Sequence, residues 1–274
     1  MTHTLIHSRC SSESVNPPVD DTTISLTKMD IIGILAARNQ FTRYLELCSR
    51  WSGNQYAELD RTVLPNPQRL MYYCPANFDD GLPIDFRSED LRIKECIDTI
   101  RSRQLHYDMI FVDPWHQYET SMRDIRAAFA LVDEGGLLLV HDCLPPNAEV
   151  ARPTLASEER LGEITWCGAT YKAYLDFVGY RDDLEYFTVD TDYGCGIIRK
   201  LPRNARWEKS LRALGVLFDT NTKRRTARDQ NKRLWAQWRQ LGDDFDGAFS
   251  FFDEHKRELL KLIAVDDFLK LKIG

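Results

Sequence analysis

Apolar and polar residues follow two patterns along the chain. Short apolar runs that end abruptly in polar residues predict buried strands, and longer stretches with apolar residues three or four positions apart predict helices. Strands are predicted at residues 42–48, 68–74, 82–86, 107–112, 137–142, 184–190 and 193–200. Helices are predicted at residues 28–41, 91–105, 121–134 and 164–178. Alternation of strands with helices predicts an α/β fold with a doubly wound, mostly parallel sheet.

The last two predicted strands are joined by a very short connection around Thr191 and Asp192. A parallel crossover needs a dozen or more residues, whereas a hairpin needs only a few. We therefore expect the seventh strand, residues 193–200, to run antiparallel to its neighbours.

The two ends of the chain differ from its centre. Residues 1–27 are rich in Ser, Thr, Pro and Asp, with too few apolar side chains to offset the entropy of ordering, so we predict a disordered tail. Residues 28–200 form the predicted α/β domain, and residues 201–274 are predicted to be strand-free and helical. The Trp-rich helices of this C-terminal extension could cover the domain or form the interface of a homo-oligomer.

Composition excludes several classes of function. The chain has 274 residues and a net charge of −6, so no overall positive field exists to attract nucleic acid or a membrane surface. It has neither a membrane-spanning apolar stretch nor a secretory apolar region, and we expect a cytoplasmic protein. Its seven cysteines include no C-x-x-C pair, which indicates reduced thiols.

Polar residues gather directly after the predicted strands. Asp113 ends the fourth strand, His141 and Asp142 end the fifth, and Glu46 lies near the end of the first. In an open α/β sheet, ligands bind at the carboxyl ends of the strands, beside the point where strand order reverses. The sequence therefore predicts one pocket that collects these side chains.

Three motifs resemble class I S-adenosylmethionine (SAM) dependent methyltransferases of the small bacterial type. They are "YDMIFVDPWHQYETSMRDI", with the pattern D-x-x-H-x-Y-E, "LVDEGGLLLVHDCLP" and "WCGATYKA…DTDYGCGIIRK", within residues 40–200. The resemblance implies the strand order 3-2-1-4-5-7-6 with an antiparallel seventh strand. It also implies SAM as cofactor and methylation of a hydroxyl group on a small molecule or saccharide.

The resemblance also implies a set of cofactor-binding residues. Glu46 would hold the methionine amine of SAM, and Asp85 and Ser88 would flank its adenine. The full predicted set is Glu46, Cys48, Gly53, Asp85, Ser88 and Asp113.

Two departures from the family pattern bear on cofactor binding. Cys48 stands where the first glycine of the family's first motif is expected. The acid that normally ends the second strand and holds the ribose is missing, unless Asp79 or Asp80 reaches back. A non-catalytic methyltransferase-like binding domain is therefore the alternative function.

The predicted catalytic residues are His116, Asp113 and His141. His116 comes three residues after Asp113, and an unperturbed imidazole with a pKa of about 6.5 is a natural base for a hydroxyl group. Strand alternation would point His141 away from Asp142, so it could also be a core residue. Trp115 and Tyr118 could line the acceptor pocket or pack against the following helix.

Asp113 and Asp142 could also share a divalent cation such as Mg²⁺, which prefers oxygen ligands. Metal-dependent catechol methyltransferases have an acid pair of this kind followed by Asn or Asp. Here Cys143 occupies that third place, and a soft thiol is a poor Mg²⁺ ligand. Asp113 and Asp142 are therefore predicted either to share a cation or to act as hydrogen-bonding groups without one.

Overall fold

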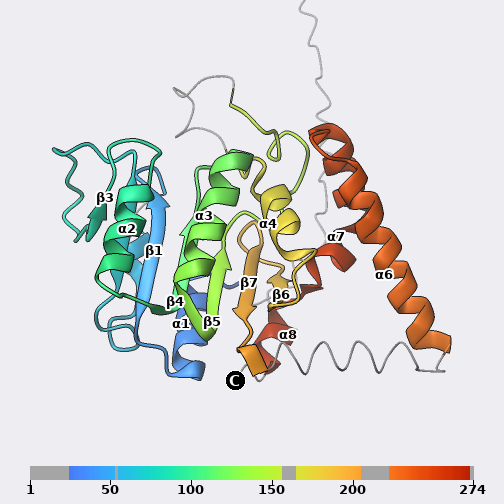
Figure 1. The fold of residues 1–274 in the computed structure, drawn as a ribbon, viewed down its shortest axis with the longest axis horizontal. Coiled ribbons are helices and arrows are strands. Elements are labelled where there is room, and N and C mark those ends of the chain that lie inside the picture. Colours follow the sequence, from blue (N-terminus) through green and yellow to red (C-terminus); the bar gives the residue numbers. More distant parts are fainter. Residues whose placement is uncertain (1–24, 53–54, 156–164, 205–221, 272–274) are drawn as a thin grey trace, which may run out of the picture.

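A computed structural model of the chain describes residues 25–52, 55–155, 165–204 and 222–271. Most of the predicted tail, residues 1–27, lies outside the described residues, as do residues 205–221 of the C-terminal extension. A central sheet has helices on both faces (Figure 1). Its strands are β1 (Tyr44–Ser49), β2 (Gln68–Tyr72), β3 (Phe86–Arg87), β4 (Tyr107–Asp113), β5 (Val132–Val140), β6 (Leu184–Val189), β7 (Cys195–Lys200) and β8 (Leu262–Ile263).

The strand order is β3-β2-β1-β4-β5-β7-β6-β8, with β7 antiparallel to both β5 and β6. The predicted doubly wound α/β fold and its antiparallel seventh strand are confirmed. The order reverses between β1 and β4, which are paired in parallel. A ligand site is therefore expected at the carboxyl ends of these two strands.

The eighth strand is a difference from the sequence prediction. Residues 201–274 were expected to be strand-free, yet β8 pairs in parallel with β6 through Thr188↔Leu262 and Val189↔Ile263. The Asp190 backbone N–H extends this pairing by donating to the Ile263 carbonyl at 2.9 Å. A strand of two residues is too short to show an alternating pattern, so periodicity does not predict it.

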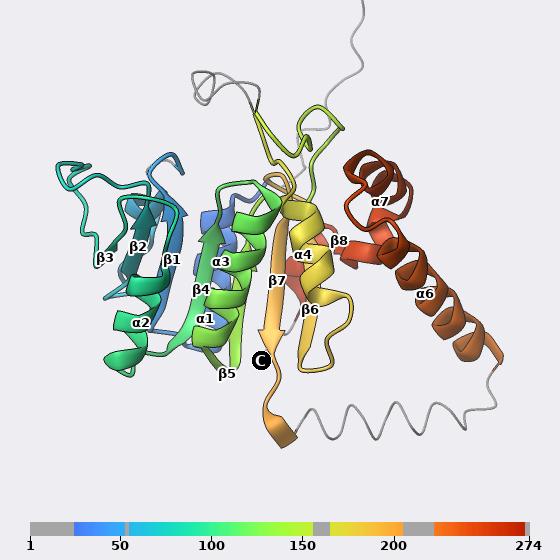
Figure 2. The ribbon, with the colours of Figure 1, turned by 45° about the horizontal axis from the view of Figure 1, so that its top comes forward.

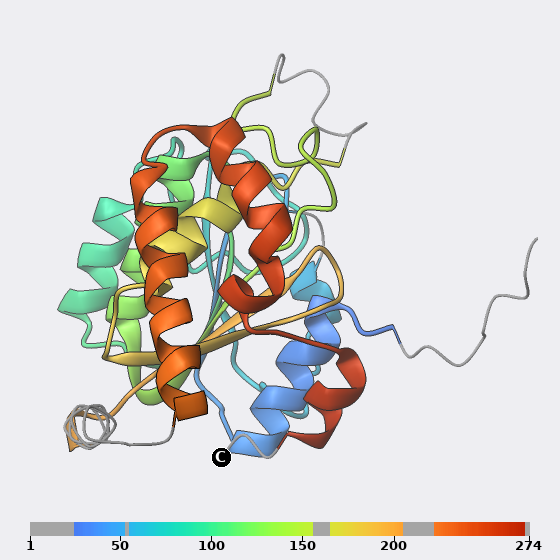
Figure 3. The same ribbon diagram turned by 90° about the vertical axis from the view of Figure 1, so that its right-hand side faces the viewer.

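The helices form a layer on each face of the sheet. α1 and α8 cover one face, and α2, α3 and α4 cover the other (Figures 1 and 3). α6 and α7 pack beside α4 (Figure 2). The bounds are α1 (Lys28–Asn39), α2 (Lys94–Ser102), α3 (Tyr118–Leu131), α4 (Thr170–Val178), α6 (Thr222–Gln240), α7 (Phe245–Leu260) and α8 (Val265–Lys270), with a short 3₁₀ helix, η1 (Gln55–Glu58).

α1 brings its first turn to the carboxyl edge of the sheet. Thr27 and Asp30 form a capping box, in which each side chain accepts a hydrogen bond from the other residue's backbone N–H. Ile31, Ile32 and Leu35 are fully buried against the sheet, and burying each such side chain contributes about 1.5–3 kcal/mol. The cap and this apolar stripe together fix where the helix begins.

The C-terminal helices are attached to the α/β domain through a half-buried carboxylate. The Asp176 carboxylate on α4 accepts hydrogen bonds from Tyr118 (2.9 Å), Lys172 (2.8 Å) and Trp238 of α6 (2.7 Å). Tyr118 therefore belongs to this contact, away from the acceptor pocket suggested for it. The predicted role of these helices in a homo-oligomer stays a prediction.

Two predictions from composition concern thiols and membranes. The six cysteines within the described residues are all free and buried, as expected for reduced thiols. Over residues 25–52, 55–155, 165–204 and 222–271, the structure contains no helix with the length and apolar character needed to cross a membrane.

Candidate functional site

A cleft of about 320 Å³ opens at the carboxyl ends of β1, β4 and β5. Its volume is at the lower end of the range for small-molecule sites. The walls are largely aromatic, formed by Trp51, Trp115, Trp166 and Tyr193. Trp51 and Trp115 contact each other, with ring centroids 4.9 Å apart. The predicted pocket position is therefore occupied by a cleft with flat apolar walls.

Asp113 lies on the floor of the cleft, at the end of β4. Its Oδ2 accepts a hydrogen bond from Gln55 at 2.9 Å, and the Lys28 ammonium lies 4.0 Å from the same oxygen. Burial alone would raise the pKa of this carboxyl group, but His116 and His141 hold it well below its usual range. Asp113 is therefore a buried carboxylate that stays ionised.

Asp142 faces the same space because its backbone departs from the strand. It has φ of +59°, in the left-handed region that Asp adopts more readily than most residues. This turn breaks the alternation of β5, so both His141 and Asp142 reach the cleft. The expectation that His141 points to the opposite face is wrong for this reason.

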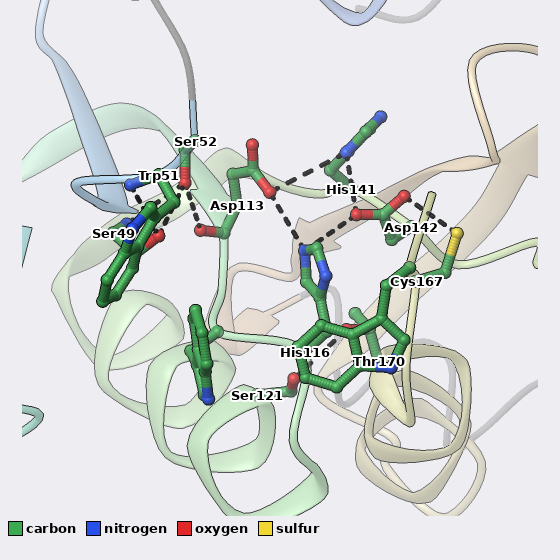
Figure 4. Close-up of polar contacts among 12 residues, drawn as sticks. Ser49, Trp51, Ser52, Asp113, His116, Ser121, His141, Asp142, Cys167 and Thr170 are labelled. Atoms are coloured by element: carbon green, nitrogen blue, oxygen red, sulfur yellow. Dashed lines mark hydrogen bonds and ion pairs between the residues drawn. The ribbon is translucent and has the colours of Figure 1, made fainter. Parts of the chain in front are cut away.

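The two acids and two histidines form one cluster (Figure 4). His116 Nε2 lies 2.9 Å from Asp142 Oδ2 and 3.5 Å from Asp113 Oδ1. His141 Nδ1 lies 3.2 Å from Asp142 Oδ2 and 3.8 Å from Asp113 Oδ1. One ligand atom each from Asp113, His141 and Asp142 can be chosen so that all lie within 4.8 Å of one another. Asp113 and Asp142 were predicted at adjacent strand ends, and the structure brings their carboxylates together.

The carboxylates control the charge of both imidazoles. Burial would lower the pKa of His116, but Asp142 and Asp113 raise it to about 9. The pKa of His141 is raised well above its usual value, with Asp142 again the largest opposing cause to burial. The neighbouring acids therefore stabilise the protonated form of both imidazoles.

The backbone of His116 is held by the loop before α4. Ala169 N–H donates to the His116 carbonyl at 2.8 Å, and the Trp166 ring lies 5.3 Å from the imidazole. Gly168 has φ of +56°, and a Cβ at this position would collide with the same carbonyl. The "WCGA" stretch therefore positions His116, although it lies some fifty residues further along the chain.

Two predicted cofactor-binding residues lie beneath the cleft. Glu46 is 1% exposed, and Tyr44 donates a 3.5 Å hydrogen bond to its carboxyl group. Burial, followed by the charge of Asp113, raises the pKa of Glu46 to about 7. Cys48 is also 1% exposed and packs with Met71. Neither side chain lines the cleft, and their roles in cofactor binding stay predictions.

The two residues predicted to flank adenine have local partners outside the cleft. Asp85 accepts a hydrogen bond from the Arg69 backbone N–H at 2.9 Å. The Ser88 hydroxyl donates to the Arg92 carbonyl at 2.6 Å. Neither lines the cleft, and Gly53 lies outside the described residues. Asp113 is thus the predicted cofactor residue that the structure places in the cleft.

Neither candidate for the missing ribose acid reaches back. Asp80 forms a bidentate ion pair with buried Arg69, at 2.8 and 2.9 Å. Asp79 accepts a hydrogen bond from the Gly81 backbone. The position after β2 is taken by Tyr73, whose φ is +53° and whose ring packs against the cleft aromatics.

Several cleft residues were not found from the sequence. Lys28, Trp51, Trp166 and Tyr193 line it, and Asp192 lies 3.4 Å from His141 Nε2. Asp192 Oδ2 also accepts a hydrogen bond from the Lys28 backbone N–H at 2.9 Å. Asp192 could have been predicted as a neighbour of the cleft, because the β6–β7 turn lies at the same edge of the sheet as the ends of β4 and β5.

The chain is similar to solved methyltransferase structures at low sequence identity. Neither a scan against protein-family models nor a search of curated proteins finds a match. Among solved structures, the O-methyltransferase TomG from Streptomyces achromogenes, in complex with SAM, is 16% identical over 67% of this chain and 84% of its own, with a TM-score of 0.46.

Two further solved structures are similar at the same level. Methyltransferase PaMTH1 from Podospora anserina, bound to S-adenosylhomocysteine (SAH), is 13% identical over 62% of this chain and 77% of its own, with a TM-score of 0.42. The MycE methyltransferase of the mycinamycin pathway, in complex with Mg, SAH and mycinamycin VI, is 16% identical over 60% of this chain and 46% of its own, with a TM-score of 0.38. Similarity at this level does not establish a family for the chain.

Proposed function

We propose that the protein is a SAM-dependent methyltransferase that acts on a hydroxyl group of a small molecule or saccharide. The observation that carries the proposal is the place of the cleft in the sheet. The order β3-β2-β1-β4-β5-β7-β6, with antiparallel β7, is the plan implied by the sequence motifs. The acids and histidines of those motifs line the cleft at the carboxyl ends of β4 and β5.

The cleft has the character needed to hold a positively charged sulfur compound. When bound, SAM supplies an electrophilic methyl group on a sulfonium centre. Faces of Trp51 and Trp115 attract such a cation, and Asp113 contributes a fixed negative charge. Lys28 supplies a cation suited to the cofactor's carboxylate.

His116 is the proposed base for the acceptor. As the acceptor hydroxyl takes the methyl group that bound SAM would supply, His116 Nε2 would accept the hydroxyl proton. Asp142 Oδ2, 2.9 Å from that nitrogen, would stabilise the imidazolium that results. His116 must enter this step neutral, and since Asp142 and Asp113 raise its pKa to about 9, methyl transfer should become faster as pH rises toward that value.

One observation favours the alternative, a non-catalytic binding domain. A cofactor ribose would find no acid at the end of β2, where Tyr73 stands, and Asp80 is paired with Arg69. The cleft would then hold a different small molecule between the same aromatic walls.

Calorimetric titration with SAM and SAH separates the two functions. Binding in the micromolar range supports the methyltransferase, whereas no binding up to millimolar concentration supports the alternative. Trp51→Ala should weaken binding at least about tenfold if this ring holds the sulfonium. Tyr180→Ala is the matched control, because Tyr180 is similarly exposed (43% against 38% for Trp51) and does not line the cleft.

A further inference from the structure

A second cavity lies away from the cleft, where the end of α4 and the start of β6 meet α6 (Figure 3). Its volume is about 430 Å³, which is within the range typical of small-molecule sites. No residue is shared between its lining and that of the cleft, so the two are separate sites. The cavity is lined by Val178, Gly179, Tyr180, Arg181, Leu184, Tyr186, Asn231, Lys232, Trp235, Ala236, Arg239 and Lys261.

The base of the cavity is apolar and is held by contacts between α4 and α6. Val178, Leu184 and Trp235 are buried. The Trp235 ring packs directly on Gly179, where a Cβ would collide with it. The Tyr180 hydroxyl donates a 2.7 Å hydrogen bond to the Trp235 carbonyl. The aromatic surface is therefore fixed before any ligand binds, which lowers the entropy cost of binding.

The rim of the cavity is cationic. Arg181, Lys232, Arg239 and Lys261 line it, and within the described part of the chain no Asp or Glu does. Asp183, outside the lining, offsets one of these charges through its ion pair with Arg181 at 2.6 Å. The chain as a whole has a net charge of −6, so the cavity is a local positive region on an acidic protein. Cavity walls of one sign concentrate an electrostatic field that attracts anions.

Aromatic rings orient two of the cations. The guanidinium carbon of Arg239 lies 3.8 Å from the centre of the Tyr180 ring, and Lys261 Nζ lies 3.9 Å from that of Tyr186. Such contacts hold a side chain in place without neutralising its charge. Lys261 also has φ of +48° at the end of α7, in a position that helices most often give to Gly. The chain thus carries an ammonium group at a backbone position where lysine is uncommon.

These features fit an anion that carries a flat ring. A phosphate dianion accepts hydrogen bonds from several cations, and the planar guanidinium of Arg239 matches its geometry. An aromatic body can stack on Tyr180, which is exposed, and on the edge of Trp235. We propose that this cavity binds a small organic phosphate with an aromatic ring. The site goes beyond the proposed methyltransferase function and does not depend on it.

Calorimetric titration of the full chain with phenyl phosphate tests the site, with inorganic phosphate and phenol as its two halves. We expect one phenyl phosphate per chain, with each half binding at least about tenfold more weakly, because each lacks the charge or the buried ring. Binding should weaken as NaCl is raised, since salt screens the cations. Absence of binding up to about 10 mM, an affinity too weak for a specific small-molecule site, would overturn the proposal. Equal affinity for phenyl phosphate and inorganic phosphate would overturn it as well.

Variants locate the bound probe. Lys232→Gln and Arg239→Gln should each weaken phenyl phosphate binding by at least about fivefold, because each removes a cation from the rim. Arg233→Gln is the matched control, because Arg233 is an exposed cation of the same helix that does not line the cavity. Trp51→Ala is the control for the cleft. Both controls should bind phenyl phosphate with the wild-type affinity.

Circular dichroism checks that each variant is folded. If Arg239→Gln does not fold, Lys232→Gln decides the question, because the Lys232 side chain is at the exposed rim. Unchanged affinity in both folded variants refutes the proposal. Loss of phenyl phosphate binding in Trp51→Ala alone would place the probe in the cleft and also refute it. Titration with SAM reports on the cleft, so the failure of one proposal is distinguishable from the failure of the other.

Discussion

Glu46 should make the protein less stable as pH rises, and Glu46→Gln should remove that effect. Its side chain is 1% exposed, and burial and then Asp113 raise its pKa from 4.5 to about 7. The folded protein therefore holds a proton that the unfolded chain releases between about pH 4.5 and 7. The free energy of unfolding must fall across this window as pH increases, by about 3 kcal/mol for this group.

Glutamine has nearly the same shape as glutamic acid and cannot ionise. Glu46→Gln should therefore match the wild type near pH 5 and become more stable than it near pH 8, by up to about 3 kcal/mol. Burial raises the pKa of Asp124 to about 6, so this group also lowers the free energy of unfolding as pH rises. Both proteins contain Asp124, so its contribution cancels in the difference between them.

Urea unfolding at pH 5, 6, 7 and 8, in the presence of EDTA, measures this difference. Glu89→Gln serves as a control, because Glu89 is exposed on a loop and its replacement should leave the pH dependence unchanged. A difference between Glu46→Gln and wild type that stays constant over this range would show that Glu46 is not the buried, protonated group described here.

Four further substitutions test other parts of the structure. His116→Ala should lower kcat about 10²- to 10⁴-fold in a methyl-transfer assay while SAM affinity measured by calorimetry survives, and near wild-type turnover would exclude His116 as the base. Cys48→Gly should destabilise the fold by about 1–2 kcal/mol in urea and leave SAM affinity unchanged or improved, because the thiol is packed beneath the cleft. Gly168→Ala should destabilise by about 1–3 kcal/mol, because its φ is +56° and the added methyl meets the His116 carbonyl; equal urea midpoints would contradict this. Asp176→Ala should expose Trp238 to solvent, which is seen as a red shift of its fluorescence. Asp183→Ala removes an ion pair with Arg181 instead and should cause no such shift.

Periodicity predicted the sheet because most strands are buried runs bounded by polar residues. β4 and the second half of β5, residues 136–140, are buried runs, and such runs are easy to recognise in a sequence. The helix predicted from residue 164 begins only at Thr170, because Gly168 is in the left-handed region and the loop before it packs on His116. β8 was missed because its two residues gain their strand conformation from β6 alone.

The site residues that lie at the ends of strands could be predicted from the sequence. Asp113, His116 and Asp142 come at or shortly after the ends of apolar runs, and the sheet brings them together. Lys28 and Asp192 are 164 residues apart in the chain, and only the packing of α1 against the β6–β7 turn joins them. The orientation of His141 depends on one positive φ at Asp142, which the alternation rule does not anticipate.

SAM is expected in the cleft between β1 and β4, and ultraviolet crosslinking measures whether it lies there. The protein is irradiated with tritium-labelled SAM and digested, and the labelled peptides are identified. We expect label on peptides that contain Trp51 or Trp115, the aromatic walls of the cleft, and its loss when excess SAH competes. Label confined to peptides outside the cleft, or label that SAH does not displace, would contradict the account.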